Sequence, residues 1–243
     1  MKIFIGQLLS ERVAFFLVAV MGGFFSSIVF SQPPDFFGRY VGVLTIEEPA
    51  EYLLTELGQD SYDNYDPNYG DPRQWDDCAL EGIPPLLFTP GVATVDLLEL
   101  DDGNIEMRYE RDDAIRTVHM NLEGFSEDQS DSPLGYSHGY WIDNILTIET
   151  SSLAGGVVIA QKRYPISVDA HVTERYWREP GDNDLKMEVV VDDPVNYRKP
   201  IKIGRTWVWS PDAPLLPWDC VGLGQRHSED LDISELRRML EEQ

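Results

Sequence analysis

The sequence predicts an all-β protein, an antiparallel meander that closes into a barrel or packs as a two-sheet sandwich, with one short helix near each end. Long runs at 168–178, 185–191 and 201–209 alternate apolar or aromatic residues with polar ones, which is the period of a half-buried strand. The tight turns at 179–184 and 192–194 are too short for a parallel crossover, so these strands must be antiparallel neighbours. Roughly ten such strands recur at regular turn spacing, which favours a barrel or sandwich over an α/β fold.

The N-terminal segment predicts export. Lys2 and Arg12 form a basic start, residues 13–30 are almost wholly apolar, and Ser31 ends a sequence that suits signal peptidase. We therefore expect residues 1–31 to be a signal peptide and 32–243 to be a single domain with its strand-rich core at 81–222. A retained membrane anchor is the alternative, because the apolar run is about long enough to span a bilayer. The expected location is periplasmic or secreted.

The net charge of the chain is −24, from 43 acidic and 19 basic residues. A surface this negative repels nucleic-acid phosphates and anionic lipid headgroups, so we expect neither a nucleic-acid partner nor a membrane contact beyond the signal segment. High solubility is the simplest interpretation of the charge, and an acidic docking surface is the alternative.

The chain contains two cysteines, Cys78 and Cys220. An even number of cysteines in an exported chain predicts a disulfide bond between them. A reactive thiol pair is the alternative, but the C-x-x-C spacing typical of such pairs is absent.

The first elements are a strand at 39–45 and a helix at 47–57. Pro49 suits the first turn of that helix, acidic residues favour its N-terminus, and Gly58 is a natural stop. Residues 59–77 combine aspartates with tyrosines. Their spacing does not match a calcium-binding loop, so we expect a solvated loop.

The middle of the chain predicts the first half of the sheet. Strands are expected at 92–100, 104–111, 114–120, 139–142, 145–151 and 156–161. The turn Asp101-Asp102-Gly103 is a strong hairpin signal. The last element is an amphipathic helix at 228–243, with a narrow apolar stripe.

Histidine with a neighbouring carboxylate is the candidate acid–base chemistry. The residues expected to act are His171, Glu149 and Glu174, because a base with a near-neutral pKa can move a proton when a carboxylate orients it. Positions 171 and 174 of one strand point to opposite faces, so they do not form a ready dyad. The alternative is a structural histidine with a cross-strand partner.

Other chemistry-bearing residues give weaker patterns. His119, His138 and His171 have no metal-ligand spacing, so no metal site and no cofactor are expected. Ser137 lies in a G-x-S-x-G sequence, but it leads into a strand rather than the helix that a nucleophile elbow requires. Arg108, Arg116, Arg175 and Arg205 alternate with acids, either on a solvated outer face or as ion pairs inside the lumen.

Strand aromatics favour a ligand in the lumen. A barrel of this size can enclose one small molecule between aromatic walls with a few polar groups. The candidate ligand-binding residues are Tyr109, His119, His138, Tyr140, Trp141, Arg175 and Trp207.

The chain resembles a large family of exported bacterial proteins of uncharacterised function. The matching residues are Gly135, Ser137, Gly139, Trp141, Leu146, Ile148, Glu149 and Thr150, then His171, Val172, Glu174, Arg175 and Tyr176, then Asp193, Pro194, Tyr197 and Pro200. The sequence Pro34-Asp35-Phe36-Phe37-Gly38 and the positions of the two cysteines also resemble that family. The chain departs from it at Tyr136, where the family has histidine, and at Asn144, where it has aspartate. The strand order is similar to calycin-type barrels such as lipocalins, an analogy of fold alone.

The lead hypothesis from these observations is an exported β-barrel that binds a small, largely apolar molecule in its lumen. An isomerase, lyase or hydrolase that uses the same cavity for acid–base chemistry is the first alternative. A structural or interaction module of the cell envelope is the second. The sequence predicts nothing about the oligomeric state.

Overall fold

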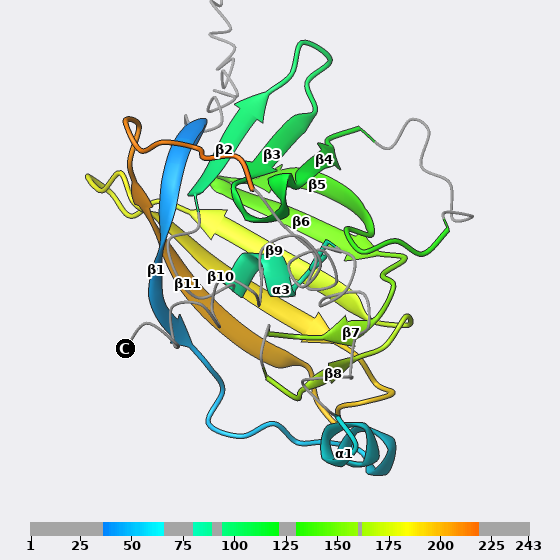
Figure 1. Ribbon diagram of the computed structural model, residues 1–243. Helices are drawn as coiled ribbons and strands as arrows, with labels where there is room; N and C mark the ends of the chain where they lie inside the picture. The colour runs from blue at the N-terminus through cyan, green and yellow to red at the C-terminus, as the bar shows by residue number, and fades with distance from the viewer. Residues whose placement is uncertain (1–35, 66–79, 89–93, 122–129, 160–161, 219–243) are drawn as a thin grey trace, which may run out of the picture. The chain divides into compact units, whose positions relative to one another are not determined.

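The computed structural model describes residues 36–65, 80–88, 94–121, 130–159 and 162–218. Nine strands form a closed barrel in the order β1-β11-β10-β9-β6-β5-β4-β3-β2, with β2 paired back to β1 (Figure 1). The strands are β1 (Gly38–Glu47), β2 (Thr94–Glu99), β3 (Ile105–Tyr109), β4 (Ile115–His119), β5 (Tyr136–Ile142), β6 (Ile145–Ser151), β9 (His171–Trp177), β10 (Leu185–Asp192) and β11 (Ile201–Trp209). The predicted all-β barrel is therefore confirmed, and the alternative sandwich is not formed.

The remaining described elements are short. β7 (Gly156–Val157) and β8 (Pro165–Ile166) form a separate two-stranded sheet. The helices are α1 (Glu56–Asp63) and α3 (Pro85–Phe88), with one 3-10 turn at Arg111–Asp113. None of the helices in the described residues has the length and apolar character needed to cross a membrane.

The barrel is not a purely antiparallel meander, which corrects the sequence prediction. β4 and β5 run parallel, pairing Val118 with Ser137 and His119 with His138. The physical reason is the connection between them, residues 120–135, which is long enough to carry the chain back to the same end of the barrel before β5 begins.

Alternation along the strands divides the side chains between core and surface. In β10, Leu185, Met187, Val189 and Val191 are all buried, as the sequence pattern predicts. The neighbouring strand β11 buries Ile201, Ile203, Arg205 and Trp207. Successive side chains point to opposite faces of a strand, so one residue in two reaches the lumen.

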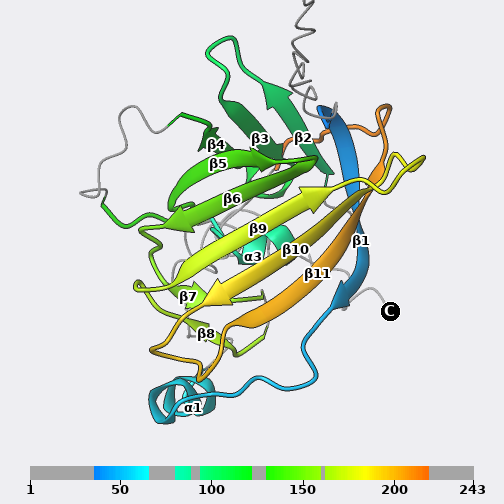
Figure 2. The same cartoon turned by 180° about the vertical axis from the view of Figure 1, so that it is seen from behind.

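Helix α3 lies inside the barrel, against the inner side of its wall (Figures 1 and 2). Leu86, Leu87 and Phe88 are each at most 1% exposed. The inward-facing Arg205 donates a hydrogen bond from Nη1 to the Leu87 carbonyl oxygen at 2.8 Å. The core is thus built from both the barrel wall and this internal helix, as Figure 2 shows from the opposite side.

The first helix begins later than predicted. β1 continues to Glu47, and helix α1 occupies Glu56–Asp63 rather than 47–57. Thr55 explains the start, because its Oγ1 accepts a hydrogen bond from Gly58 N at 3.0 Å and so caps the helix. Leu54 is held in a β-bridge to Tyr197, which prevents the preceding residues from joining the helix. The predicted loop at 59–77 accordingly starts as helix.

Several predicted features lie outside the described residues. These are the signal peptide at 1–31, the cysteines Cys78 and Cys220 with their predicted disulfide, and the C-terminal helix at 228–243. They stay predictions from the sequence.

Candidate functional site

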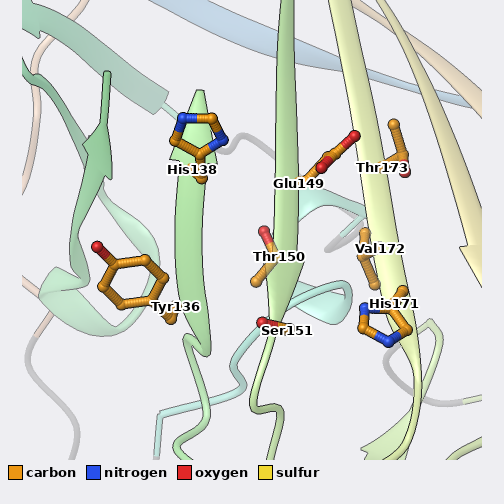
Figure 3. Close-up of a pocket in the computed structure, with 8 residues that line it drawn as sticks. All are labelled: Tyr136, His138, Glu149, Thr150, Ser151, His171, Val172 and Thr173. Atoms are coloured by element: carbon orange, nitrogen blue, oxygen red, sulfur yellow. The ribbon is translucent and has the colours of Figure 1, made fainter. Parts of the chain in front are cut away.

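A cleft of about 400 Å³ opens on the outer surface of the barrel over β5, β6 and β9. Its lining residues are Tyr136, His138, Glu149, Thr150, Ser151, His171, Val172 and Thr173 (Figure 3). Two of the predicted catalytic residues, His171 and Glu149, therefore come together with a second histidine, His138, in one depression. We call this depression the outer cleft.

Strand register places the polar side chains of the outer cleft in two cross-strand rows. His138 of β5 is opposite Glu149 of β6, which is opposite Thr173 of β9. Tyr136 is opposite Ser151, and His171 of β9 lies on the other side of Ser151 (Figure 3). Residues of one row face the same side of the sheet, so the cleft presents imidazole, carboxylate, hydroxyl and phenol groups together.

Glu149 and His171 do not form an acid–base dyad. The two side chains lie at opposite ends of the outer cleft, and Ser151 lies beside His171 (Figure 3). Glu149 instead accepts a hydrogen bond from the Tyr140 hydroxyl at 2.8 Å. This bond to a carboxylate raises the pKa of Tyr140 and keeps the phenol protonated. The imidazole nearest to Glu149 in register is His138, whose ring packs against Tyr140 at a centroid distance of 5.7 Å.

The ring of Tyr136, at one end of the outer cleft, packs against a histidine of the neighbouring strand β4. His119 of β4 stacks on Tyr136 with ring centroids 4.7 Å apart and an interplanar angle of 6°. His119 was expected to face the lumen, but β4 turns it outwards because Arg116 and Val118 occupy the buried positions of that strand. Its role in the described structure is to hold the Tyr136 ring in place.

Glu174 lies on the opposite side of the sheet from the outer cleft, inside the barrel. Its two carboxylate oxygens accept hydrogen bonds from Arg116 at 2.6 Å and 3.1 Å. The Tyr176 hydroxyl donates a third bond to it at 2.6 Å. The side chains of Arg116 and Glu174 are only 1% and 0% exposed, so Glu174 is a buried ion-pair partner that the cleft does not reach.

Arg116 ties together the strands that form the floor of the outer cleft. From β4 it donates to Ser137 of β5 at 2.8 Å and to Thr150 of β6 at 2.7 Å, in addition to Glu174 of β9. Burial opposes the positive charge, but Glu174 outweighs this effect and raises the pKa of Arg116 above its ordinary value. Ser137 is therefore a buried hydroxyl within β5, which is the strand context that the sequence predicts for it.

The predicted lumenal ligand residues do not share one cavity, which corrects the sequence prediction. Tyr109 and Trp207 face the interior, whereas His119, His138, Tyr140 and Arg175 lie on the outer surface. Trp141 is half-buried and packs against Phe36 with ring centroids 5.2 Å apart. The predicted residues divide between the interior and the outer surface because successive side chains along a strand point to opposite faces of the sheet.

The four strand arginines also divide between the two faces. Arg108 pairs with Glu106 at 2.6 Å and Arg175 pairs with Glu188 at 3.4 Å, both on the outer surface. Arg116 and Arg205 are buried. Both predicted alternatives therefore occur: Arg108 and Arg175 lie on the outer face, and Arg116 forms an ion pair inside the barrel. Arg205 is buried as well.

Arg205 is buried without a described acidic partner. It donates from Nε to the Val43 carbonyl at 3.0 Å and lies 4.7 Å above the Trp207 ring, while Nη2 is unpartnered. Burial alone lowers the pKa of Arg205 to about 10. Gly42 makes room for the guanidinium, because a Cβ there would lie 2.5 Å from its Cζ atom. The alternation of β11, with arginine in frame with Ile201 and Ile203, is the sequence signal that could have located it.

No group of three histidine, cysteine, aspartate or glutamate side chains among the described residues is arranged to hold a metal ion. The histidines of the outer cleft are too spread along β5 and β9 for that purpose (Figure 3). The outer cleft itself offers hydrogen-bonding groups and the titratable side chains of His138, Glu149 and His171.

Comparison of the chain with protein-family models, with curated proteins and with solved structures finds no match. The resemblance to exported bacterial proteins and the analogy with lipocalins therefore stay predictions from the sequence.

Proposed function

We propose that this β-barrel is a binding protein for a small polar molecule and that the molecule occupies the outer cleft. The observation that carries the proposal is the convergence of His138, Glu149 and His171 with Tyr136 and Thr173 around one open volume of about 400 Å³. Binding sites typically combine such a concave surface with a few well-placed polar groups. The barrel wall under them is rigidly held, because the buried Arg116 network joins all the strands that carry these residues.

The outer cleft suits a polar ligand better than an apolar one. Glu149 supplies acceptors, Ser151 and Thr173 supply hydroxyls, and each imidazole can both donate and accept. The lumen, where an apolar molecule was expected, has α3 packed against the inner side of its wall.

The test is a titration of the protein with small probes of different charge. Glucose, choline and acetate represent neutral, cationic and anionic molecules, and binding is followed by NMR shifts of the Thr150, Val172 and Thr173 methyl groups. We expect one probe to shift all three signals in the wild type and to lose this effect in a His138→Ala, His171→Ala double variant. Shifts that persist in the double variant, or that appear only elsewhere on the barrel, would place binding outside the cleft.

An enzyme acting at the same cleft is the alternative, supported by the cross-strand pair His138 and Glu149. Tyr140 holds the carboxylate by a hydrogen bond, so His138 would be the base and the oriented carboxylate would assist it. Turnover of a bound probe that disappears in Glu149→Gln, while binding remains, would establish catalysis. Binding without turnover supports the binding protein.

A ligand in the lumen is a second candidate binding mode, supported by two unpartnered donors. Arg205 Nη2 and Trp207 Nε1 are both buried, and neither has a hydrogen-bond acceptor among the described residues. Buried polar groups without partners are costly, so a ligand or water that supplied acceptors there would stabilise the barrel. Native mass spectrometry before and after denaturation tests this mode. A co-purifying mass that is lost in Trp207→Phe supports it, and a bare protein in both cases argues against it.

Export to the periplasm or medium is a further proposal, supported by the basic and apolar pattern of residues 1–31. The intact mass of the protein recovered from its own cells tests it. A chain that begins at Gln32 and is lighter by two hydrogen atoms than its reduced form would support both export and the Cys78–Cys220 bond. A full-length mass in the membrane fraction would instead support the retained anchor.

A further inference from the structure

A second depression lies on the outer surface at the other end of β9. It has a volume of about 360 Å³ and includes Trp177 of β9, Glu188 of β10 and both Lys202 and Gly204 of β11. The outer cleft includes His171 and Thr173 at the opposite end of the same strand. We call the second depression the tryptophan cleft.

The outward side chains of β9 connect the two clefts. His171, Thr173, Arg175 and Trp177 follow one another at every second position, which places them on one face of the strand. Six residues of extended strand span about 20 Å at about 3.3 Å per residue. The two clefts and the row between them therefore form one elongated surface, much longer than a single small molecule.

Most charged groups along this surface already contact one another, and Glu47 in the tryptophan cleft has no ion-pair partner among the described residues. Glu188 lies between Arg175 at 3.4 Å and Lys202 at 3.0 Å, and Glu149 accepts a hydrogen bond from Tyr140. A strongly charged ligand would have to break these pairs, and a polyanion would in addition be repelled by the net charge of −24. A neutral ligand that carries many hydroxyl groups can use the same side chains without separating them.

Each end of the surface carries an aromatic ring that is fixed in place. Tyr136 is stacked on His119, and the Trp177 indole donates from Nε1 to Glu179 at 2.9 Å. A sugar ring presents polar hydroxyls at its edge and C–H groups on its face, so it can pack against such a ring and hydrogen-bond around it. The two fixed rings are separated by about the length of one strand, so they suit two different sugar units of one oligosaccharide chain.

We propose that the elongated surface binds a linear, neutral oligosaccharide, with one sugar unit at Tyr136 and another at Trp177. This rests on the proposed binding function of the outer cleft and extends it from a single small molecule to a chain of several units. The row formed by Thr173 and Arg175 contacts the intervening units.

Calorimetric titration with sugars of two lengths tests the proposal. The probes are cellohexaose, maltohexaose and N-acetylchitohexaose, each compared with its monosaccharide. We expect one hexasaccharide to bind at least about tenfold more tightly than its monosaccharide, because it occupies both clefts. Equal affinity for the two lengths would overturn the elongated site.

Variants of Trp177 and Tyr136 test the contribution of each end of the elongated surface to binding. Trp177→Ala should weaken the hexasaccharide about tenfold and leave the monosaccharide unchanged, whereas Tyr136→Ala should weaken both. Trp177→Phe should restore most of the loss, which excludes a simple folding defect. The matched control is Trp218→Ala, a surface indole that packs on Arg111 and lines neither cleft.

The outcomes distinguish this inference from the proposed function. If a monosaccharide binds and depends on Tyr136, while Trp177→Ala changes nothing, the outer cleft remains a binding site and the elongated surface is refuted. If no sugar binds but another probe shifts the methyl signals of the cleft, the choice of a glycan is wrong and the binding function stands. Tighter binding of hexagalacturonate than of every neutral hexasaccharide would also refute it.

Discussion

Separating Arg116 from Glu174 should cost much of the stability of the barrel. Glu174→Leu leaves a buried guanidinium with only neutral hydroxyl groups, such as those of Ser137 and Thr150, as acceptors, and it removes the acceptor of the Tyr176 hydroxyl. Removing one partner of a buried ion pair typically costs about 3–5 kcal/mol. We expect a similar loss for Arg116→Met, because the remaining carboxylate would keep only Tyr176 as a donor.

The double variant Arg116→Met, Glu174→Leu should be far less damaging than either single variant. It removes both charges, and Ser137 and Thr150 can still hydrogen-bond to each other across their 3.2 Å separation. Replacing a buried pair with apolar side chains of similar volume is often close to neutral. We therefore expect the double variant within about 2 kcal/mol of the wild type, which implies a coupling energy of about 4 kcal/mol or more between the two positions.

Urea unfolding at pH 7, followed by tryptophan fluorescence, measures these free energies of unfolding. The matched control is Arg108→Met, which breaks an ion pair of the same 2.6 Å length whose arginine is 48% exposed. That control should lose less than about 1 kcal/mol, because solvent screens an exposed pair. Single-variant losses below about 1 kcal/mol, or strictly additive losses in the double variant, would refute the assignment of Arg116 and Glu174 as a coupled buried pair.

Three further predictions concern the cap, the second buried arginine and alkaline pH. Thr55→Ala should cost about 1–2 kcal/mol in the same assay because it uncaps α1 at Gly58 N, and Thr55→Ser should retain most of that stability. Arg205→Met should lower the free energy of unfolding much less than Arg116→Met. Burial lowers the pKa of Arg205 from 12.5 to about 10, so keeping this side chain charged at neutral pH costs about 3 kcal/mol, and that cost offsets its hydrogen bonds. A loss equal to that of Arg116→Met would contradict this. Burial raises the pKa of Tyr109 and Tyr176 above 10. Their contribution to the free energy of unfolding is therefore complete below pH 10 and falls above it, by about 1.4 kcal/mol per pH unit for each tyrosine. Deprotonation of Arg205 in the folded state partly offsets this loss of stability. Phenolate absorbance near 295 nm should then rise together with unfolding, and titration of all tyrosines in the folded state would refute it.

The strands of the barrel could be predicted well because their pattern is local. β11 begins and ends where the alternation of Ile201, Ile203, Trp207 and Trp209 predicts, and the buried face of β10 is the predicted one. The first helix could not be predicted from propensity alone. Its start depends on the bond that Thr55 makes to Val195 and on the bridge between Leu54 and Tyr197, contacts with a distant part of the chain.

The candidate site could be predicted only in part. His171 and Glu149 were found from their residue types, and both line the outer cleft. Their separation within it and the cross-strand pairing of His138 with Glu149 follow from the register of three strands, which no local pattern specifies. Glu174 shows the same limit, because its partner Arg116 is 58 positions away in the sequence.

The sequence by itself determined that the chain forms β-strands and which residues of each strand share a face, because alternation is a property of neighbouring residues. Only the tertiary structure decided which face is the interior at the charged positions, since Arg116 and Arg205 are buried by strands from elsewhere in the chain. It also decided that helix α3 packs inside the barrel and that the polar cleft lies outside. These are consequences of barrel closure, which brings β1 beside both β2 and β11 and cannot be read from any one segment.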